Sequence, residues 1–280
     1  MAAPAGSDAE VEGHAGTLLV PDCVVFRDGL LVPEPRHLVA EEPLAVVVEG
    51  HPLAYLMCTP GHERELALGY LLTEAWVARA EDVGLLHFCP RASDEQTGQV
   101  HVRLVTGASL RRQPGVARHV YSSCSLCGAE AIAAVADDLQ PLARPQVDAA
   151  ALVRLGRELS AQQRLFRLTG GTHAAALLHR PADGETCVFV REDIGRHNAL
   201  DKAVGAAACR GVALSQPLLL LSGRLSFEMV AKAARAGIAA VAGVSAPTAL
   251  SVALARRLGM FLAGFLRGET FTVYAGQLAC

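Results

Sequence analysis

Short apolar runs alternate with helical patterns over the second half of the chain, and this alternation constrains the fold most. Continuous apolar segments predict buried strands at 217–221, 238–244 and 260–266, and the segments between them have the apolar spacing of helices. Further strands are predicted at 174–178, 186–190 and 270–274. Strands that are apolar on both faces belong to a sheet that helices cover on both sides. The sequence therefore predicts an α/β unit with a mixed, partly parallel sheet.

The part of the chain before this unit has shorter and more varied elements. Apolar runs at 44–48 and 53–58 flank a turn and predict a hairpin. Thr59 and Pro60 predict the start of a helix that extends to residue 77, because Thr is a capping residue and Pro suits the first helical position. We expect a disordered tail at 1–16, a smaller α+β domain at 17–115 and the larger domain at 116–280.

The composition limits the class of protein. The chain has 280 residues, 51% of them apolar, and a net charge of −3. This balance argues against binding to nucleic acid or to an anionic membrane through bulk charge. The first 16 residues lack the pattern of a signal peptide, and polar residues interrupt the most apolar stretch, 237–255. We therefore expect a cytoplasmic protein whose isolated cysteines are free thiols.

Three predicted strand-to-helix turns carry unusual polar side chains. They lie at 191–198 (REDIGRHN), 222–226 (SGRLS) and 243–248 (GVSAPT). Each follows the carboxyl end of a predicted strand, which in an α/β sheet is the edge where ligands bind. Helix N-terminal amides and arginine side chains both bind phosphate. The candidate binding residues at this edge are His173, Asp193, Arg196, His197, Ser222, Arg224 and Ser245.

Each of these turns also has a simpler interpretation. Asp193 and Arg196 can form a surface ion pair, and Ser222 and Ser245 can be ordinary helix caps. Three such turns in one sheet favour an anionic small molecule, such as a nucleotide-like phosphate ester. The chain has no Walker A or G-x-G-x-x-G pattern, so an ordinary ATP or NAD site is not expected.

Cys124 and Cys127 form the only C-x-x-C pair among the eight cysteines, at the start of the larger predicted domain. A basic run (Arg111, Arg112, Arg118, His119) precedes the pair and favours thiolate over thiol. A zinc site needs further ligands that the neighbouring sequence does not supply, so we expect no structural metal. A redox disulfide and a sulfur carrier both remain open on the spacing alone.

Several segments together resemble the formate dehydrogenase accessory sulfurtransferase family. The matching motifs are 123–128 (SCSLCG), 168–175 (LTGGTHAA), 192–202 (EDIGRHNALDK), 222–229 (SGRLSFEM), 244–248 (VSAPT) and 264–268 (GFLRG). Residues 41–76 also resemble the N-terminal part of the family. The resemblance covers 17–278, and the motif at 192–202 is the most specific.

The resemblance implies a cytoplasmic sulfur carrier, a sulfurtransferase that acts as a carrier more than as a turnover enzyme. It implies that Cys124 accepts persulfide sulfur from a cysteine desulfurase, with Cys127 assisting. The sulfur then passes to molybdenum bis(molybdopterin guanine dinucleotide) before this cofactor is inserted into the catalytic subunit of formate dehydrogenase. It also implies a homodimer, a larger domain that is cytidine-deaminase-like in fold, and a guanine dinucleotide site lined by Phe265, Leu266, Arg267, Gly268, Glu269 and Thr270.

Two rival functions belong to other classes. One is a deaminase-like hydrolase that binds zinc through Cys124 and Cys127. The other is a chaperone that only holds the cofactor, so that the two cysteines are incidental. Stoichiometric zinc would favour the first rival, and cofactor maturation without either cysteine would favour the second.

Overall fold

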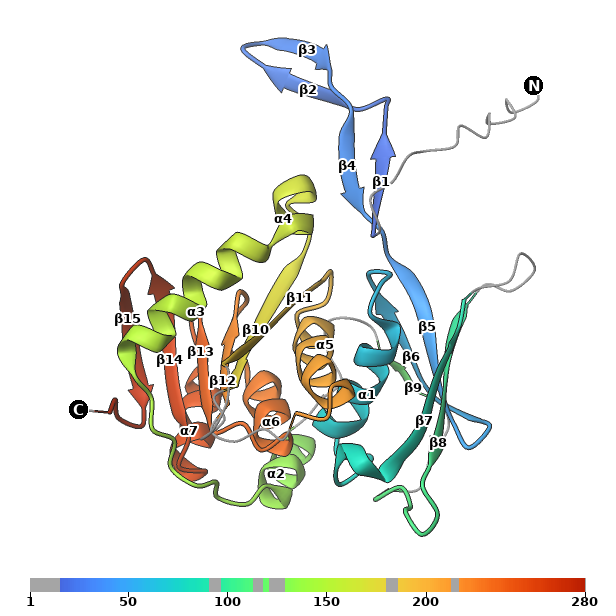
Figure 1. The fold of residues 1–280 in the computed structure, drawn as a ribbon. Helices are drawn as coiled ribbons and strands as arrows, with labels where there is room; N and C mark the ends of the chain where they lie inside the picture. Colours follow the sequence, from blue (N-terminus) through green and yellow to red (C-terminus); the bar gives the residue numbers. More distant parts are fainter. Residues whose placement is uncertain are drawn as a thin grey trace.

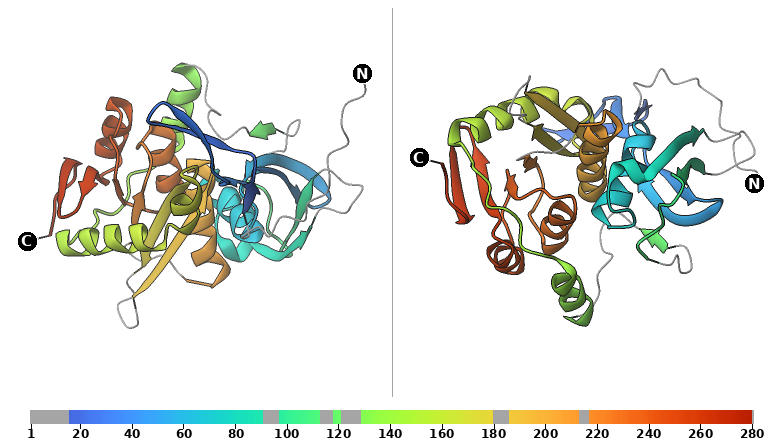
Figure 2. Two further views of the ribbon diagram at one scale, coloured as in Figure 1. Left: turned by 90° about the horizontal axis from the view of Figure 1, so that it is seen from above. Right: turned by 60° about the horizontal axis from the view of Figure 1, so that its bottom comes forward.

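Two β-sheets and a pair of helices between them form the body of the molecule (Figures 1 and 2). The computed structural model describes residues 16–90, 97–112, 118–120, 129–179, 186–212 and 217–279. Apart from Gly16, the tail predicted at 1–16 lies outside these residues.

The larger sheet has six strands in the order β11-β10-β12-β13-β14-β15. They are β10 (His173–His179), β11 (Cys187–Asp193), β12 (Leu218–Leu221), β13 (Ala240–Gly243), β14 (Phe261–Arg267) and β15 (Thr270–Ala275). Strands β12, β13 and β14 are parallel, whereas β10, β11 and β15 pair antiparallel with their neighbours. The predicted mixed, partly parallel sheet is confirmed.

Helices cover both faces of this sheet, as predicted. On one face, α5 (Arg196–Cys209), α6 (Phe227–Arg235) and α7 (Ala249–Arg257) form one apolar core with side chains such as Ala175 and Leu177, and α2 (Ala129–Asp138) packs against it. On the other face, α3 (Ala149–Gln162) packs with the alternate side chains, such as Ala174 and Ala176. The two cores are separate because successive strand residues point to opposite faces. The likeness to cytidine deaminases stays a prediction.

The smaller sheet has five strands in the order β7-β8-β5-β6-β9. They are β5 (Glu42–Val48), β6 (His51–Cys58), β7 (Val83–Cys89), β8 (Gly98–Leu104) and β9 (Arg118–Val120), with a 3-10 turn, η1 (Ala80–Asp82), before β7. The predicted hairpin is β5–β6, and Glu49 and Gly50 both have positive φ in its two-residue turn. Because β9 pairs with β6, this sheet extends past the predicted domain boundary at residue 115.

Helix α1 (Glu63–Thr73) joins the two sheets by packing against α5 (Figure 2). Two glycines allow this close approach. A Cβ at Gly69 would lie 1.8 Å from the backbone oxygen of Asp201, and one at Gly205 would lie 1.8 Å from that of Glu65. Any side chain at either position would clash with backbone atoms, so these glycines set the distance between the helices.

The predicted helix that begins at Thr59 and extends to residue 77 is shorter in the structure, where α1 ends at Thr73. Helix α1 begins at Glu63, because Thr59 is occupied by contacts with the end of β11. Helix α5 begins at Arg196, with Gly195 as its N-cap residue and Asn198 inside its first turn. Helix α3 ends at Gln162, and after Gln163 the short α4 (Arg164–Thr169) follows.

Residues 17–39 form a two-part β-arm, of which the outer part projects from the body while residues 36–39 contact α4 (Figure 1). Its strands are β1 (Thr17–Val20), β2 (Val24–Arg27), β3 (Leu30–Pro33) and β4 (Arg36–Val39), paired as β1–β4 and β2–β3. Seven large apolar side chains of the arm are exposed: Leu18, Val24, Phe26, Leu30, Leu31, Val32 and Leu38. Exposed apolar surface of this extent marks an interaction surface.

Candidate functional site

The predicted polar turns meet at one edge of the six-stranded sheet. The carboxyl ends of β12, β13 and β14 lie there, because these strands are parallel and in register. The antiparallel pairing brings His173 at the start of β10 opposite Asp193 at the end of β11, and Ala175 opposite Leu221. This edge is the end of the sheet nearest α4 in Figure 1. We call it the rim, and define it by the seven residues predicted for the turns (His173, Asp193, Arg196, His197, Ser222, Arg224 and Ser245).

The start of α5 carries two basic side chains onto the rim. The Nε of Arg196 is buried and has no hydrogen-bond partner among the described residues. His197 is held by Glu228 of α6, with 3.1 Å between Nε2 and the carboxylate. A buried donor without a partner costs free energy, so Arg196 is poised for an acceptor that binds at the rim.

Strand β10 and the turn after β12 lie against the same arginine. Ser222 Oγ accepts a hydrogen bond from the backbone of Ala174 at 2.8 Å, so this serine fixes the turn. A Cβ at Gly223 would lie 3.3 Å from Nδ1 of His173 and 3.6 Å from Cβ of Arg196. The missing side chain thus leaves His173 and Arg196 close together.

The charge around His173 is positive. Partial burial lowers the pKa of His173, and the nearby Arg196, His197 and Arg224 lower it further. Arg224, which also acts on His173, is exposed to solvent. A site that disfavours a further positive charge favours an anion.

The serine at the start of α6 occupies the N-cap position, but its side chain does not cap the helix. Ser226 is the N-cap residue, but its Oγ is buried and makes no hydrogen bond with any described residue. The sequence pattern alone gave no sign of this, because Ser before a helix is an ordinary cap. Together with Arg196 Nε, this hydroxyl is the second unsatisfied buried polar group near the start of the rim helices.

The turn from β14 to β15 lies at the same edge of the sheet as the rim, next to the turn that follows β13. Phe265 has a φ of 56° and its side chain is 40% exposed, a strained conformation for an aromatic residue. Its backbone N–H donates to Ser245 at 3.2 Å, which joins this strand to the turn after β13. The Arg267 guanidinium lies 6.0 Å from the centre of the Phe265 ring. Leu266 is buried, whereas Arg267, Gly268, Glu269 and Thr270 are exposed.

Asp193 is the one predicted rim residue that points inward. It is fully buried, and Lys202 Nζ lies 2.7 Å from its carboxylate. The alternative surface ion pair with Arg196 does not form. The carboxylate instead accepts hydrogen bonds from the backbone of Thr59 and Gly195 and from the side chain of Asn198. Asp193 therefore shapes the turn from within.

A second buried ionic cluster was not predicted. Lys232 of α6 lies 2.8 Å from Asp201 of α5 and 3.0 Å from Glu74 after α1. Arg235 also pairs with Glu74. Burial by itself lowers the pKa of Lys232, but the two carboxylates outweigh it and the net shift is upward. The residues lie 31 to 161 positions apart, so no local pattern could have found this cluster.

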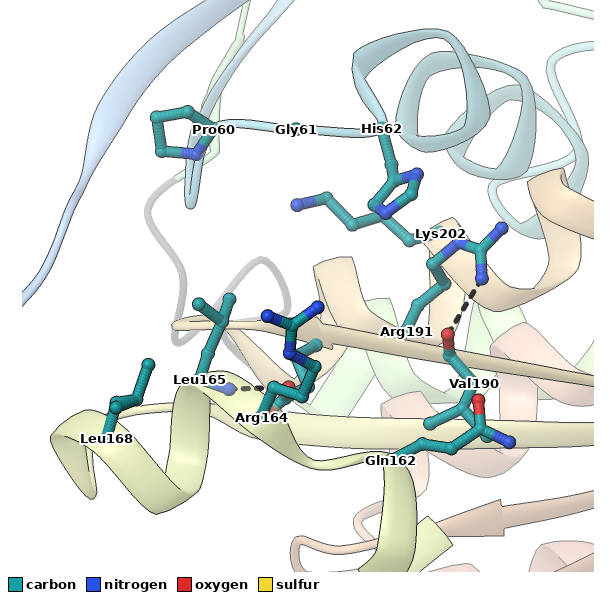
Figure 3. A pocket seen from close by; sticks show the side chains of 11 residues that line it. Pro60, Gly61, His62, Gln162, Arg164, Leu165, Leu168, Val190, Arg191 and Lys202 are labelled. Carbon is teal, nitrogen blue, oxygen red and sulfur yellow. Dashed lines mark hydrogen bonds between the residues drawn. The ribbon is translucent and has the colours of Figure 1, made fainter. Parts of the chain in front are cut away.

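A cavity of about 430 Å³ lies beside the rim, between the start of α1, α4 and β11 (Figure 3). Its charged side chains are largely neutralised: Arg191 pairs with Glu65, and Lys202 with Asp193. Glu192 accepts from the backbone of Leu165 and Phe166. Arg164 also lines the cavity, so the cavity carries charged groups of both signs, whereas the charge around His173 at the rim is positive.

Cys124 and Cys127 lie outside the described residues. The described segments on either side of them are β9, which ends four residues before Cys124, and α2, which begins two residues after Cys127. Strand β9 runs parallel to β6, with Val120 opposite Leu56. Three residues after Leu56 comes Thr59, which contacts Asp193. Strand β9, which leads to the cysteines, therefore ends opposite Leu56, three residues before the Thr59 that contacts the rim residue Asp193.

The described ranges, 16–90, 97–112, 118–120, 129–179, 186–212 and 217–279, contain neither a metal site nor a membrane-spanning helix. No three His, Cys, Asp or Glu side chains in them converge as a metal site. In the same ranges, no helix is long and apolar enough to cross a membrane. The zinc alternative for the cysteine pair is untested, because that pair is not described.

Comparisons with known proteins agree over almost the whole chain. The chain is 42% identical over 269 residues to the sulfur carrier protein FdhD of Streptomyces avermitilis, covering 90% of this chain and 92% of that protein. It is 42% identical over 288 residues to the same-named protein of Anaeromyxobacter dehalogenans, covering 98% and 94%. A crystal structure described as a formate dehydrogenase accessory protein, from Desulfotalea psychrophila, superposes with a TM-score of 0.73 at 25% identity, covering 93% and 97%. The model of the FdhD/NarQ family matches residues 39–279, and the chain belongs to this family.

Proposed function

We propose that this protein is a cytoplasmic sulfur carrier for formate dehydrogenase. In this proposal Cys124 accepts sulfur from a cysteine desulfurase, and Cys127 assists. The acceptor substrate is molybdenum held by two pterin guanine dinucleotides, which then enter the catalytic subunit of formate dehydrogenase. The names of the relatives support the carrier role and the link to formate dehydrogenase.

The rim is the observation that carries the proposal for this chain. A dinucleotide pterin presents phosphates, and phosphates need donors that are not already used. Arg196 Nε and Ser226 Oγ are buried and lack partners in the described part of the chain, and Arg224 is exposed beside them. We assign the phosphates to Arg196 and Arg224, and the guanine end to the turn from Phe265 to Thr270. A bidentate guanidinium contact to phosphate is a strong, charge-assisted interaction.

The loading step is a thiol exchange. The Cys124 thiolate attacks the outer sulfur of the desulfurase persulfide, a new S–S bond forms, and the desulfurase cysteine leaves as a thiolate. The basic residues before Cys124 favour the attacking thiolate. The buried Cys58 is a poor alternative carrier, because burial raises its pKa to about 12.

Loading is tested by incubation with a cysteine desulfurase and cysteine, followed by mass spectrometry of the intact protein and of its peptides. We expect one added sulfur on Cys124, none in Cys124→Ala, and reduced transfer in Cys127→Ala. Cys58→Ala is the matched control and should load normally. An unmodified Cys124 in the wild-type protein would refute the proposal, and normal formate dehydrogenase maturation with both cysteines replaced would favour a cofactor-holding chaperone.

The β-arm supports the proposed homodimer. Phe26 and Leu31 are paired on one side of the β2–β3 hairpin, and Val25 and Val32 on the other, so both sides carry apolar residues. A two-stranded hairpin is marginal alone and needs a covering partner. Residues 17–39 carry two arginines against three acids, which leaves little charge to repel a second copy. We therefore assign a second copy of the chain as the partner of the arm.

The arm is tested by replacing Phe26 and Leu31 with Ser and measuring mass by light scattering. We expect the wild-type protein to be a dimer and the double variant a monomer with the same thermal unfolding of the body. The matched control replaces Leu85 and Val105, which are exposed outside the arm. A dimer that survives the arm substitutions would place the interface elsewhere.

A further inference from the structure

Strand β11 is an edge strand of the six-stranded sheet, and part of its outer edge faces the cavity of about 430 Å³ beside the rim. The residues of the strand that line this cavity are Val190, Arg191 and Glu192. In the described part of the chain, β11 pairs with β10 alone. Proteins usually cover or blunt such an edge, because its unpaired backbone groups can pair with another chain.

The pairing of β10 with β11 shows which backbone groups face outward. Ala174 in β10 uses both of its backbone groups on Ser222, since its N–H donates to the serine hydroxyl and its C=O accepts from the serine N–H. These groups therefore point away from β11. Opposite residues of an antiparallel pair exchange both hydrogen bonds or neither, so the backbone groups of Glu192, opposite Ala174, point away from β10. Two residues earlier, Val190 faces the same way, and its C=O accepts from the Arg191 side chain at 2.8 Å.

The outward backbone groups match an extended peptide better than a small ion. The N–H of Val190 and both backbone groups of Glu192 have no partner among the described residues. A free phosphate or carboxylate would bind the N–H groups but would also face the C=O of Glu192. An extended peptide supplies both a donor and an acceptor at every second residue, which is the pattern that this edge presents.

The wall beside the edge selects the side chains of such a peptide. The side chains of Val190 and Glu192 point toward α3 and α4, because Val190 belongs to the core that includes α3 and Glu192 accepts from the α4 backbone. A peptide residue opposite either of them points its side chain to the same face. On that face the cavity is lined by Arg164, Leu165 and Leu168 (Figure 3).

Arg164 gives this wall its charge preference. Its guanidinium points into the cavity (Figure 3) and makes no hydrogen bond or ion pair with any described residue. The other cations of the lining are already paired. His62 and Arg191 both contact Glu65, and Lys202 is buried in an ion pair of its own. The open position beside Arg164 therefore favours a carboxylate.

We propose that the outer edge of β11 is a docking site for an extended, acidic segment of a partner protein. The segment adds a strand across Val190 and Glu192. It places a carboxylate on Arg164 and an apolar side chain, two residues away on the same face, against Leu165 and Leu168. The site is distinct from the rim and does not use the cysteine pair, so the inference does not depend on the proposed function.

The probe is the peptide Thr-Glu-Thr-Leu-Thr-Glu-Thr with fluorescein at its N-terminus and an amide at its C-terminus. It places Glu and Leu on one face and reads the same in both directions, so its orientation on β11 does not matter. Anisotropy with the full chain measures its affinity. We expect N-methylation of the Glu and Leu residues, whose N–H groups would bond to β11, to weaken binding about tenfold or more. N-methylation of the Thr residues is the matched control and should retain binding.

Charge reversal at Arg164 tests the side-chain contact. We expect Arg164→Glu to bind the probe about 10–100-fold more weakly, and to bind the peptide Thr-Lys-Thr-Leu-Thr-Lys-Thr in its place. Arg154→Glu, at an exposed arginine of α3, should leave both affinities unchanged. Amide exchange measured by NMR should slow at the N–H of Glu192 when the probe binds, and should not change at the N–H of Arg191, which faces β10.

Three results would overturn the proposal. Equal affinities for the two methylated peptides would show that β11 does not pair with the probe. Displacement of the probe by free glutamate or inorganic phosphate at similar concentrations, without protection of the Glu192 N–H, would show a small-anion site only. A Glu192 N–H that is already protected without the probe would show that the chain itself or a second copy covers this edge.

Discussion

The motif at 192–202 contributes residues both to the rim and to a buried cluster with Thr59, and the two differ in how their polar groups are satisfied. We call this cluster of Thr59, Asp193, Asn198 and Lys202 the inter-sheet clamp. In the clamp, the Asp193 carboxylate accepts from Thr59, Gly195 and Asn198 and pairs with Lys202. At the rim, only three residues away, the buried Nε of Arg196 has no partner among the described residues. Polar groups that stabilise the fold have hydrogen-bond partners within the fold. A buried donor without such a partner lowers stability, so Arg196 is the residue of this motif that we expect to bind a ligand.

The largest change in the free energy of unfolding is expected from a substitution in the inter-sheet clamp. Asp193→Asn leaves the Lys202 ammonium buried at 1% exposure without its anion. We expect the free energy of unfolding to fall by about 3–5 kcal/mol, measured by chemical denaturation. Glu269→Gln is the matched control, since its ion pair with Arg157 is exposed and worth about 1 kcal/mol or less. A loss for Asp193→Asn as small as that of the control would contradict the contrast between clamp and rim.

A second prediction concerns acid stability at the contact of α1 with β11. Burial alone would raise the pKa of Glu65, but the hydrogen bonds from Arg191 and His62 prevail and lower it to about 2. A carboxyl with a lowered folded-state pKa contributes stability above its unfolded pKa, and this contribution is lost as the pH falls toward 2. We expect the wild-type protein to lose up to about 3 kcal/mol relative to Glu65→Gln between pH 5 and pH 2.

Denaturation curves of both proteins at several pH values measure this difference. Parallel curves for the wild-type protein and Glu65→Gln would show that the pair with Arg191 contributes nothing to acid stability.

The smallest effect on folding, and the largest on binding, is expected at the rim. Arg196→Ala removes a donor that the fold does not use. We expect guanosine diphosphate to bind about 10–100-fold more weakly, the value of one charge-assisted hydrogen bond. Unfolding should change by less than about 0.5 kcal/mol. Calorimetry measures the first quantity and denaturation the second.

Arg154→Ala, at an exposed arginine on α3, is the matched control and should change neither quantity. An Arg196→Ala variant that binds normally but unfolds readily would reverse the roles that we assign to the rim and the clamp.

The sequence by itself predicted the larger sheet and the edge where the polar turns meet. Apolar runs on both faces require a covered sheet, and the carboxyl ends of parallel strands must share an edge, so both conclusions follow from local pattern. The positions of the rim residues along the chain therefore follow from the sequence. The motif at 192–202 also predicted the family, which the matching family model confirms.

The tertiary structure alone decided what each residue of that motif does. Asp193 and Arg196 look equally polar in the sequence, but one faces Lys202 and Thr59 in the interior and the other faces the rim. Thr59 looked like a helix cap and instead binds a turn 134 residues further along the chain. Contacts between residues so far apart depend on how α1 and α5 pack, and no local pattern encodes that packing. The sequence determined which residues are polar, and the fold determined which of them remain free to bind.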